Sequence, residues 1–301
     1  MKDLQKKNTL VTCCIPCYNH ENYIRDAIFS VINQTYENIE LIVIDDGSSD
    51  NSVEEIKKTE DLCRKRFVNT TFIFRENKGV SYTLNQMLSL AKGEYISFLA
   101  SDDEFLPEKI DFLLDKIKSL SSDYCAVFGD AKIFSENDIT LSGSFIKRYN
   151  NAKSPYGEVS YESILHNNYL PAMSGLYVRD SILSIGGFSN ELRLEDWDIY
   201  LKLLQRFKIK LFPEIVAKYR LHDLNSILIE NTRLLKDTLF ILQSQREYAF
   251  SCGFDKIWYW KLYDTYYALM IKKSLQCKDI HSVSIFMLIT YLLNKLRKRF
   301  L

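Results

Sequence analysis

Short apolar runs alternate with helix-patterned segments through the first hundred residues, and this alternation sharply limits the possible folds. The apolar runs suit buried strands, whereas the segments between them repeat apolar residues at helical spacing. Strands and helices in this order predict an α/β fold with a mostly parallel sheet and helices on both faces. The expected strands are 10–15, 39–44, 70–74 and 95–99, and the expected helices are 23–32, 53–67 and 79–91.

The rest of the chain is less regular. We expect a helix over 107–120, a strand over 125–134, a polar and mobile surface segment over 135–160, and a helix over 196–207. Beyond residue 226 only helical periodicity remains, in stretches at 226–250, 255–275 and 279–299. The sequence therefore predicts an α/β domain over 1–225 and a helical C-terminal extension over 226–301.

Composition narrows the class of protein. The 39 basic and 39 acidic side chains give a formal net charge of zero, whereas nucleic-acid-binding domains are usually basic, so we expect no nucleic-acid partner. Seven irregularly spaced cysteines and a polar N-terminus favour a reducing, cytoplasmic location. The apolar segment 282–301 ends in basic residues and is too short to span a bilayer. It is either a packed helix or a contact with an anionic membrane surface.

Cys14 and Cys17 have the spacing of a thioredoxin-type redox pair. In such pairs the first sulfur lies at a helix N-terminus, which lowers the pKa of the thiol. Here the expected helix begins near Glu21, after both cysteines, so we interpret them as packing residues of a buried strand. The turn after this strand also lacks the glycines of a dinucleotide-binding loop or a P-loop.

Acidic pairs follow two of the expected strands. Asp45 and Asp46 end the second strand, and Asp102 and Asp103 follow the fourth. Because parallel strands end at one edge of a sheet, these carboxylates should lie near one another, and a cation would offset their repulsion. Mn²⁺ or Mg²⁺ is the expected ion, and such ions commonly bridge substrate phosphates. The alternative is that each aspartate caps the next turn or helix.

These pairs belong to a longer series of motifs. The series is Pro16-x-Tyr18-Asn19, Asp45-Asp46-Gly47-Ser48, Asn77-x-Gly79, Ala91-Lys92-Gly93-Glu94-Tyr95, Ser101-Asp102-Asp103, Gly186-Gly187-Phe188, Glu195-Asp196-Trp197 and Tyr219-Arg220-Leu221-His222. It resembles the family 2 glycosyltransferases with the GT-A (Rossmann-like) fold, over residues 9–225. The resemblance implies an inverting enzyme of bacterial surface polysaccharide or oligosaccharide biosynthesis. Such an enzyme would move a hexose or N-acetylhexosamine from a nucleotide sugar, with UDP expected, to a hydroxyl of a glycan or polyprenol-linked acceptor.

The resemblance also implies roles for individual residues. Asp196 matches the general base, with Glu195 beside it, although acids at a helix start are also common for structural reasons. Asp102, Asp103 and His222 would hold Mn²⁺ or Mg²⁺. The expected nucleotide-sugar contacts are Pro16, Tyr18, Asn19, Asp45, Asp46, Asn77, Lys78, Gly79, Ser101 and Asp102. The family analogy further predicts a cytoplasmic protein, peripheral on the cytoplasmic face of the inner membrane through 282–301.

One position departs from the family pattern. Ala100 stands where the first acid of the Asp-x-Asp motif is usual, and this departure keeps open a non-catalytic, degenerate glycosyltransferase-like subunit. The missing first acid also puts the affinity of this chain for the donor and the metal in question. A sugar nucleotidyltransferase is a further alternative, but it would carry a glycine-rich basic loop after the first strand, which this sequence lacks.

Overall fold

The computed structural model describes residues 9–135, 143–150, 155–190, 192–222 and 232–276. The chain separates into two compact units, one of residues 1–160 with 169–223 and one of residues 161–168 with 224–301. The predicted boundary after residue 225 falls among residues 223–231, outside the described residues.

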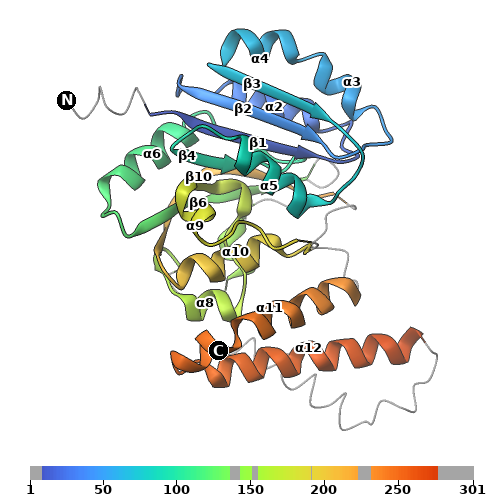
Figure 1. Ribbon diagram of the computed structural model, residues 1–301, viewed down its shortest axis with the longest axis vertical. Coiled ribbons are helices and arrows are strands. Elements are labelled where there is room, and N and C mark those ends of the chain that lie inside the picture. The colour runs from blue at the N-terminus through green and yellow to red at the C-terminus, as the bar shows by residue number, and fades with distance from the viewer. Residues whose placement is uncertain (1–8, 136–142, 151–154, 191, 223–231, 277–301) are drawn as a thin grey trace. The chain divides into compact units, whose positions relative to one another are not determined.

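A mixed sheet forms the centre of the larger unit (Figure 1). Within the described residues its strand order is β3-β2-β1-β4-β9-β6-β10-β5, with β7 paired to β6 and β8 paired to β10. The strands are β1 Val11–Cys17, β2 Ile39–Asp45, β3 Asn69–Phe74, β4 Tyr95–Phe98, β5 Glu104–Phe105, β6 Tyr124–Phe134, β7 Gly143–Ser144, β8 Gly157–Val159, β9 Gly175–Val178 and β10 Lys208–Arg220.

Strands β3, β2, β1 and β4 form the parallel half of the sheet, as predicted (Figure 1). Strand β2 is buried along its whole length, which explains the apolar run from Leu41 to Ile44. The helices of this region are α2 Ile24–Ile32, α3 Ser52–Lys57, α4 Glu60–Arg66 and α5 Val80–Leu90. The prediction of one helix over 53–67 was wrong, because the chain turns at Thr59, whose amide and hydroxyl both donate to the carbonyl of Ile56 (2.9 and 2.7 Å).

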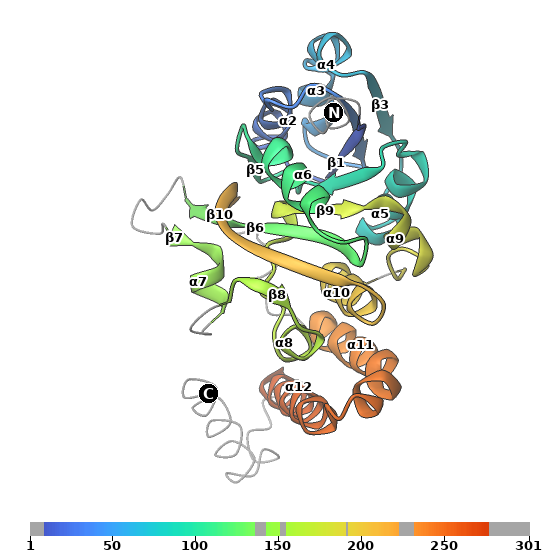
Figure 2. The same ribbon diagram turned by 90° about the vertical axis from the view of Figure 1, so that its left-hand side faces the viewer.

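Strands β9, β6, β10, β5, β7 and β8 form the mixed half (Figure 2). Strand β9 runs antiparallel to β4 and β6, whereas β10 runs parallel to β6 and antiparallel to β5 and β8. The register of β10 against β6 shifts between Leu211 and Ile215, around Pro213, which cannot donate a ladder hydrogen bond. The sequence did not predict β9 or most of β10, although the α/β fold class is confirmed.

The remaining elements of the larger unit are α6 Lys109–Ser119, α7 Phe145–Tyr149, the 3₁₀ helix η1 Ala172–Ser174, α9 Arg179–Ser184 and α10 Glu195–Leu204. The prediction of a mobile surface segment over 135–160 was wrong for the described part, because Phe145 and Ile146 are buried. Buried Asp130 anchors this part by accepting hydrogen bonds from the Ile146 amide (3.1 Å) and the Tyr156 hydroxyl (3.0 Å).

The smaller unit consists of α8 Tyr161–His166, α11 Thr232–Ser251 and α12 Asp255–Gln276. Aromatic rings join them: Tyr161 lies 4.8 Å from Tyr248, and His166 stacks on Trp260 at 5.0 Å, both between ring centroids. The predicted helices at 226–250 and 255–275 are confirmed where they are described. The predicted helix at 279–299 and the membrane contact at 282–301 lie outside the described residues. Among the described helices, none is long and apolar enough to cross a bilayer.

Candidate functional site

The turns after β1, β2 and β4 meet at one edge of the parallel half, and the end of β10 joins them. The Asp46 amide donates to the Cys17 carbonyl (2.8 Å), and the Leu99 amide donates to the Cys14 carbonyl (2.9 Å). The Arg220 amide donates to the Asp103 carboxylate (2.9 Å), which ties β10 to the turn after β4. Ligands of open α/β sheets bind at this edge.

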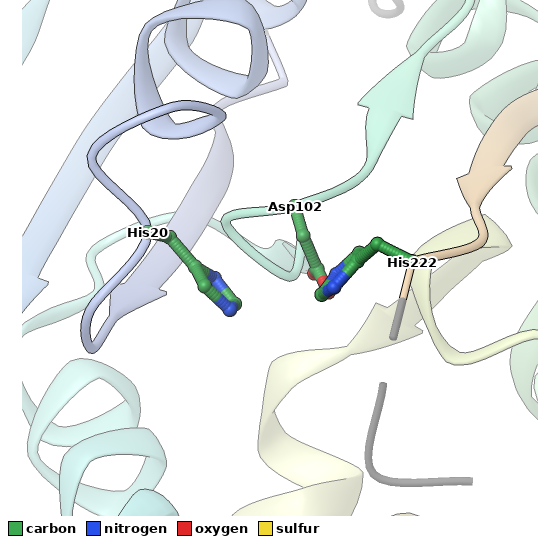
Figure 3. Close-up of side chains that lie close together, drawn as sticks. All are labelled: His20, Asp102 and His222. Atoms are coloured by element: carbon green, nitrogen blue, oxygen red, sulfur yellow. The ribbon is translucent and has the colours of Figure 1, made fainter. Parts of the chain in front are cut away.

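Three side chains from separate segments converge there (Figure 3). His20 comes from the turn after β1, Asp102 from the turn after β4, and His222 from just beyond β10. Their candidate ligand atoms all lie within 4.8 Å of one another. His222 Nε2 lies 3.0 Å from Asp102 Oδ2, and His20 Nδ1 lies 2.7 Å from the Ser101 hydroxyl. The structure thus brings together the predicted Asp102, His222 and Ser101, and it adds His20.

The electrostatics of this cluster suit cation binding. Burial alone raises the pKa of Asp102, but the hydrogen bond with His222, the nearby His20 and a backbone hydrogen bond outweigh it and lower that pKa. Burial lowers the pKa of His20, against the opposing effect of Asp102. An ionised carboxylate beside a neutral imidazole is the protonation state in which both groups bind a metal.

The donor set fits a divalent ion. One carboxylate oxygen and two imidazole nitrogens are close enough to share one ion. Mg²⁺ strongly prefers oxygen ligands, whereas imidazole nitrogens suit transition metals. A bound ion of this kind would neutralise charge on a phosphate group placed beside it.

Asp103, the remaining predicted ligand, does not join the cluster. Its buried carboxylate accepts the hydrogen bond from the Arg220 amide. Burial, followed by the charge of Asp102, raises the pKa of Asp103 well above its ordinary value. The geometry therefore gives Asp103 a role in joining the turn after β4 to β10.

The turn after β1 is held in a defined conformation by the turn after β2. Asn19 has a φ of 54°, a left-handed backbone that asparagine tolerates. Its amide donates to the Ser48 hydroxyl (2.8 Å), and its side-chain oxygen accepts from the Ser49 amide (2.8 Å). The His20 amide donates to the Ser52 hydroxyl (2.9 Å). Asn19, predicted as a donor contact, therefore also positions His20.

The other predicted residues of this turn differ in exposure. Pro16 lies within β1 and is half-buried, whereas the Tyr18 side chain is 51% exposed. An exposed aromatic ring at this edge can stack on a nucleobase or a sugar. The donor contacts predicted for Pro16, Tyr18 and Asn19 stay predictions.

Asp45 and Asp46 are buried and have partners within the protein. The Asp45 carboxylate accepts from the amide (2.9 Å) and hydroxyl (2.6 Å) of Ser48. The Asp46 carboxylate accepts from the amides of Lys78 (2.8 Å) and Gly79 (2.9 Å) and pairs with Arg75. These contacts match the turn-capping alternative, and the predicted donor contact of both aspartates stays a prediction.

The segment before α5 lies against the turn after β2. Gly47 has a φ of 78°, and a Cβ atom there would lie 2.6 Å from the Asn77 amide nitrogen, so only glycine fits. Asn77 and Lys78 are exposed, and Gly79 is half-buried at the start of α5. The Lys78 ammonium lies 4.8 Å from the Tyr82 ring centroid. An exposed lysine at this edge can pair with a phosphate group.

Helix α5 connects this edge to the loop before α10. The Asn85 side chain accepts from the Phe188 amide (2.9 Å) and donates to the Phe188 carbonyl (2.8 Å), and the Ser81 hydroxyl donates to the Leu192 carbonyl (2.9 Å). A Cβ atom on Gly187 would lie 2.6 Å from Asn85 Oδ1. The absence of a side chain at Gly187 therefore leaves room for Asn85 in this docking.

The predicted base lies at the start of α10, as the sequence indicated. Asp196 and Glu195 are half-buried, and the Asp196 carboxylate accepts from the Trp197 amide (2.7 Å). The neighbouring Asp198 is buried and pairs with Lys202 (2.8 Å) and Ser189 (2.7 Å). Asp198 is thus a structural residue, which leaves Asp196 and Glu195 as candidates for a base.

Sequence reasoning missed two residues of this site. Arg220 is buried, its guanidinium donates to the Asp102 carbonyl (2.9 Å), and it pairs with Asp26 and Glu104 (both 3.1 Å). His20 directly follows the Tyr18-Asn19 motif, and its place in a turn at the ligand-binding edge was the one available signal. Neither the pairing of Arg220 nor the direction of the His20 ring can be read from neighbouring residues.

The cysteines of β1 do not form a redox site. Cys13, Cys14 and Cys17 are buried, and burial raises the pKa of Cys13 and of Cys17 to about 12. A reactive thiol needs a lowered pKa. The interpretation of Cys14 and Cys17 as strand-packing residues is confirmed.

Known proteins share this fold. The UDP-GlcNAc complex of S. aureus TarS 1-349 superposes with a TM-score of 0.60 at 18% identity, over 77% of this chain and 65% of that chain. The mannosyltransferase PcManGT from Pyrobaculum calidifontis, in complex with GDP-Man and Mn²⁺, superposes with a TM-score of 0.54 at 14% identity, over 95% and 84%. At these identities the likeness shows the fold, and it confirms the predicted GT-A architecture.

The sequence relatives have higher identity to this chain than these two structures. An uncharacterized glycosyltransferase of Rickettsia typhi is 32% identical over 72% of this chain and 67% of the relative. One of Rickettsia felis is 32% identical over 71% of this chain but 34% of the relative, so the chain spans about a third of that protein. These relatives favour a glycosyltransferase over the nucleotidyltransferase alternative. The sequence model of glycosyl transferase family 2 matches residues 12–169, and this chain belongs to that family.

Proposed function

We propose that this protein transfers a sugar from a nucleotide diphosphate donor, with UDP as the expected nucleotide, to an acceptor hydroxyl with inversion at the anomeric carbon. The observation that carries the proposal is the cluster of His20, Asp102 and His222 at the ligand-binding edge of the sheet. A divalent ion held there would supply the positive charge that a departing nucleotide diphosphate needs. The Mn²⁺ and GDP-Man of PcManGT and the UDP-GlcNAc of TarS support this donor class.

The chain's own residues would divide the work. Tyr18 offers an exposed ring to the nucleobase and Lys78 an exposed cation to the diphosphate. Inversion requires the acceptor hydroxyl to attack from the face opposite the leaving group. Asp196, at the N-terminus of α10, would accept the proton of that hydroxyl as the new bond forms. The dipole of a helix favours a negative charge at this end.

The acceptor and the location belong to the same proposal. We expect a glycan or polyprenol-linked acceptor, in surface polysaccharide or oligosaccharide biosynthesis, and a cytoplasmic protein that contacts the inner membrane through 282–301. Binding to anionic liposomes that weakens with salt, and that is lost on removal of 282–301, would support the membrane contact.

Calorimetry of UDP binding tests the donor and the metal together. UDP should bind much more tightly with Mn²⁺ than with chelator, and Asp102→Asn should remove this difference. Asp61→Asn, a charge-matched change at an exposed position, is the control and should retain it. Equal UDP affinity with and without Mn²⁺ in the unaltered protein would refute metal-assisted donor binding. Metal-dependent binding without hydrolysis or transfer of any nucleotide sugar would favour the non-catalytic alternative.

A further inference from the structure

The cluster lacks one carboxylate that the family pattern supplies. Ala100 takes the place of the usual first acid, and its side chain is exposed at the start of the turn that ends in Asp102. The Asp103 amide donates to the Ala100 carbonyl (3.0 Å), so residue 100 belongs to the same tight turn. Asp103 does not fill the gap, because its carboxylate accepts from the Arg220 amide.

His20 reaches the cluster from a different segment. The turn after β1 fixes its backbone through the contacts of Asn19 and Ser52. The Ser101 hydroxyl, 2.7 Å from Nδ1, fixes its ring. In most metal-binding histidines, one ring nitrogen binds the metal and the other makes such a hydrogen bond. That hydrogen bond sets the orientation of the ring. With Nδ1 engaged by Ser101, Nε2 is the second nitrogen through which His20 can bind an ion.

We propose that His20 is a third protein ligand of the divalent ion, and that it substitutes for the carboxylate missing at residue 100. This inference rests on the proposed function, since it concerns the ion that would bind the donor diphosphate. Exchanging a carboxylate for an imidazole makes the protein ligands less negative and richer in nitrogen. The site therefore selects Mn²⁺, or another first-row transition ion, over Mg²⁺.

The alternative role for His20 is packing. Its ring centroid lies 5.9 Å from that of Tyr23 and 6.0 Å from that of His222, so the ring is also part of an aromatic group. A packing histidine would affect stability but would not change the ligands of the ion. Counting nitrogen ligands separates the two roles.

The direct test is pulsed electron paramagnetic resonance of Mn²⁺ bound to the full-length protein, without and with UDP. Two histidine nitrogens coupled to Mn²⁺ are expected in the unaltered protein. His20→Gln should leave one and weaken Mn²⁺ binding by about tenfold or more, judging from the effect of disturbing metal-site residues. His166→Gln, which alters a stacked histidine of the smaller unit, is the matched control and should change neither.

A second variant reverses the exchange of ligands. Ala100→Asp in the His20→Gln protein should restore ion binding and shift the preference toward Mg²⁺, measured by calorimetry with each ion alone. One coupled nitrogen in the unaltered protein, or unchanged Mn²⁺ affinity in His20→Gln, would overturn the inference while leaving the proposed function intact. No Mn²⁺ binding by the unaltered protein with UDP present would instead refute the proposed metal site itself. The nitrogen count in the unaltered protein decides the question even if a variant does not fold.

Discussion

The two halves of the sheet differ in how they are built and in what they contribute to the site. The parallel half is made of short strands joined through helices, and its turns carry His20 and Asp102. Its strands β1, β2 and β4 are mostly buried, whereas β3 is half-buried. The mixed half is built on the long strands β6 and β10. His222 lies just beyond β10, and Asp196 lies at the start of α10, the helix before β10. In the proposed function, the parallel half binds mainly the donor and the mixed half acts on the acceptor. The candidate site is therefore assembled where the halves meet, because the cluster of His20, Asp102 and His222 takes side chains from both.

The largest effect is expected from removing the proposed base, and it separates donor binding from action on the acceptor. Asp196→Asn keeps the size of the side chain but removes a proton acceptor, so turnover should fall by about a hundredfold or more. The affinity for UDP with Mn²⁺ should stay unchanged, because the donor groups lie on other segments. Steady-state kinetics and calorimetry measure the two quantities. A larger loss of turnover in Glu195→Gln would move the base to Glu195.

The next prediction concerns the connection between the halves. Arg220, at the end of β10, contacts the carbonyl of Asp102 in the turn after β4, Glu104 of β5 and Asp26 of α2. Arg220→Ala removes the hydrogen bond to the Asp102 carbonyl and both ion pairs of a buried side chain, although Glu104 keeps Lys218 as a partner and Asp26 is largely exposed. The free energy of unfolding should therefore fall by about 2 kcal/mol. Thermal or urea denaturation measures the loss. Arg206→Ala, which alters a partly exposed arginine, is the control, and an equal effect of both changes would contradict the prediction.

A buried lysine lies where the halves join. Lys109 of α6 contacts the hydroxyl of Ser97 on β4 and the carbonyl of Gly175 on β9. Burial holds the pKa of Lys109 well below its ordinary value, so the unfolded chain binds a proton that the folded protein does not. The contribution of Lys109 to the free energy of unfolding should therefore rise with pH between that lowered pKa and about pH 10.4, by at most about 1.4 kcal/mol per pH unit.

Lys109→Met tests this dependence. The variant should be more stable than the unaltered protein at pH 7, and the difference should shrink toward pH 10, as measured by denaturation at several pH values. Buried cysteines such as Cys13, whose pKa is raised to about 12, oppose this trend, because their thiols ionise in the unfolded chain from about pH 8.5. Their contribution is common to both proteins and cancels in the difference. Lys92→Met, at an exposed position, should show no such trend. A constant difference between Lys109→Met and the unaltered protein would mean that Lys109 stays charged.

The smallest effect is expected within the parallel half. Cys14 and Cys17 are buried in β1, so reductant and mild oxidant should leave turnover unchanged, as should Cys14→Ala. Thiol labelling of the native protein, followed by mass spectrometry, should modify exposed Cys252 before either of them. Rapid labelling of Cys17 would show that β1 opens far more readily than its burial suggests.

The parallel half was predictable from the sequence, because its strands are continuous apolar runs and its helices have amphipathic periodicity. The mixed half was not, because β9 is only four residues long and its pairing with β4 and β6 depends on distant segments. The break between α3 and α4 carries no glycine or proline, and the hydrogen bonds that stabilise it appear only in the folded chain.

The site shows the same division. Asp102 and His222 could be proposed from their motifs, and the structure places them 3.0 Å apart. The contribution of His20 could not be predicted, because it depends on the left-handed backbone of Asn19 and on Ser101, more than eighty residues away in the chain. Likewise, the motif around Asp103 did not show that its carboxylate faces the Arg220 amide.

Helix α5 has a consequence for altering specificity. The loop before α10 is attached to α5 through two side chains four residues apart, Ser81 and Asn85, and both bond only to its backbone at Leu192 and Phe188. Backbone attachment leaves exposed side chains of that loop, such as Asn190, free to vary between proteins. Gly187, the buried Phe188 and Leu192, and Ser189, which bonds to Asp198, would have to be kept. A chimera that exchanges this loop between relatives should therefore retain the fold and the cluster of His20, Asp102 and His222 while changing which acceptors are used. The contacts with α5 thus define where such a loop could be exchanged to build transferases of new specificity.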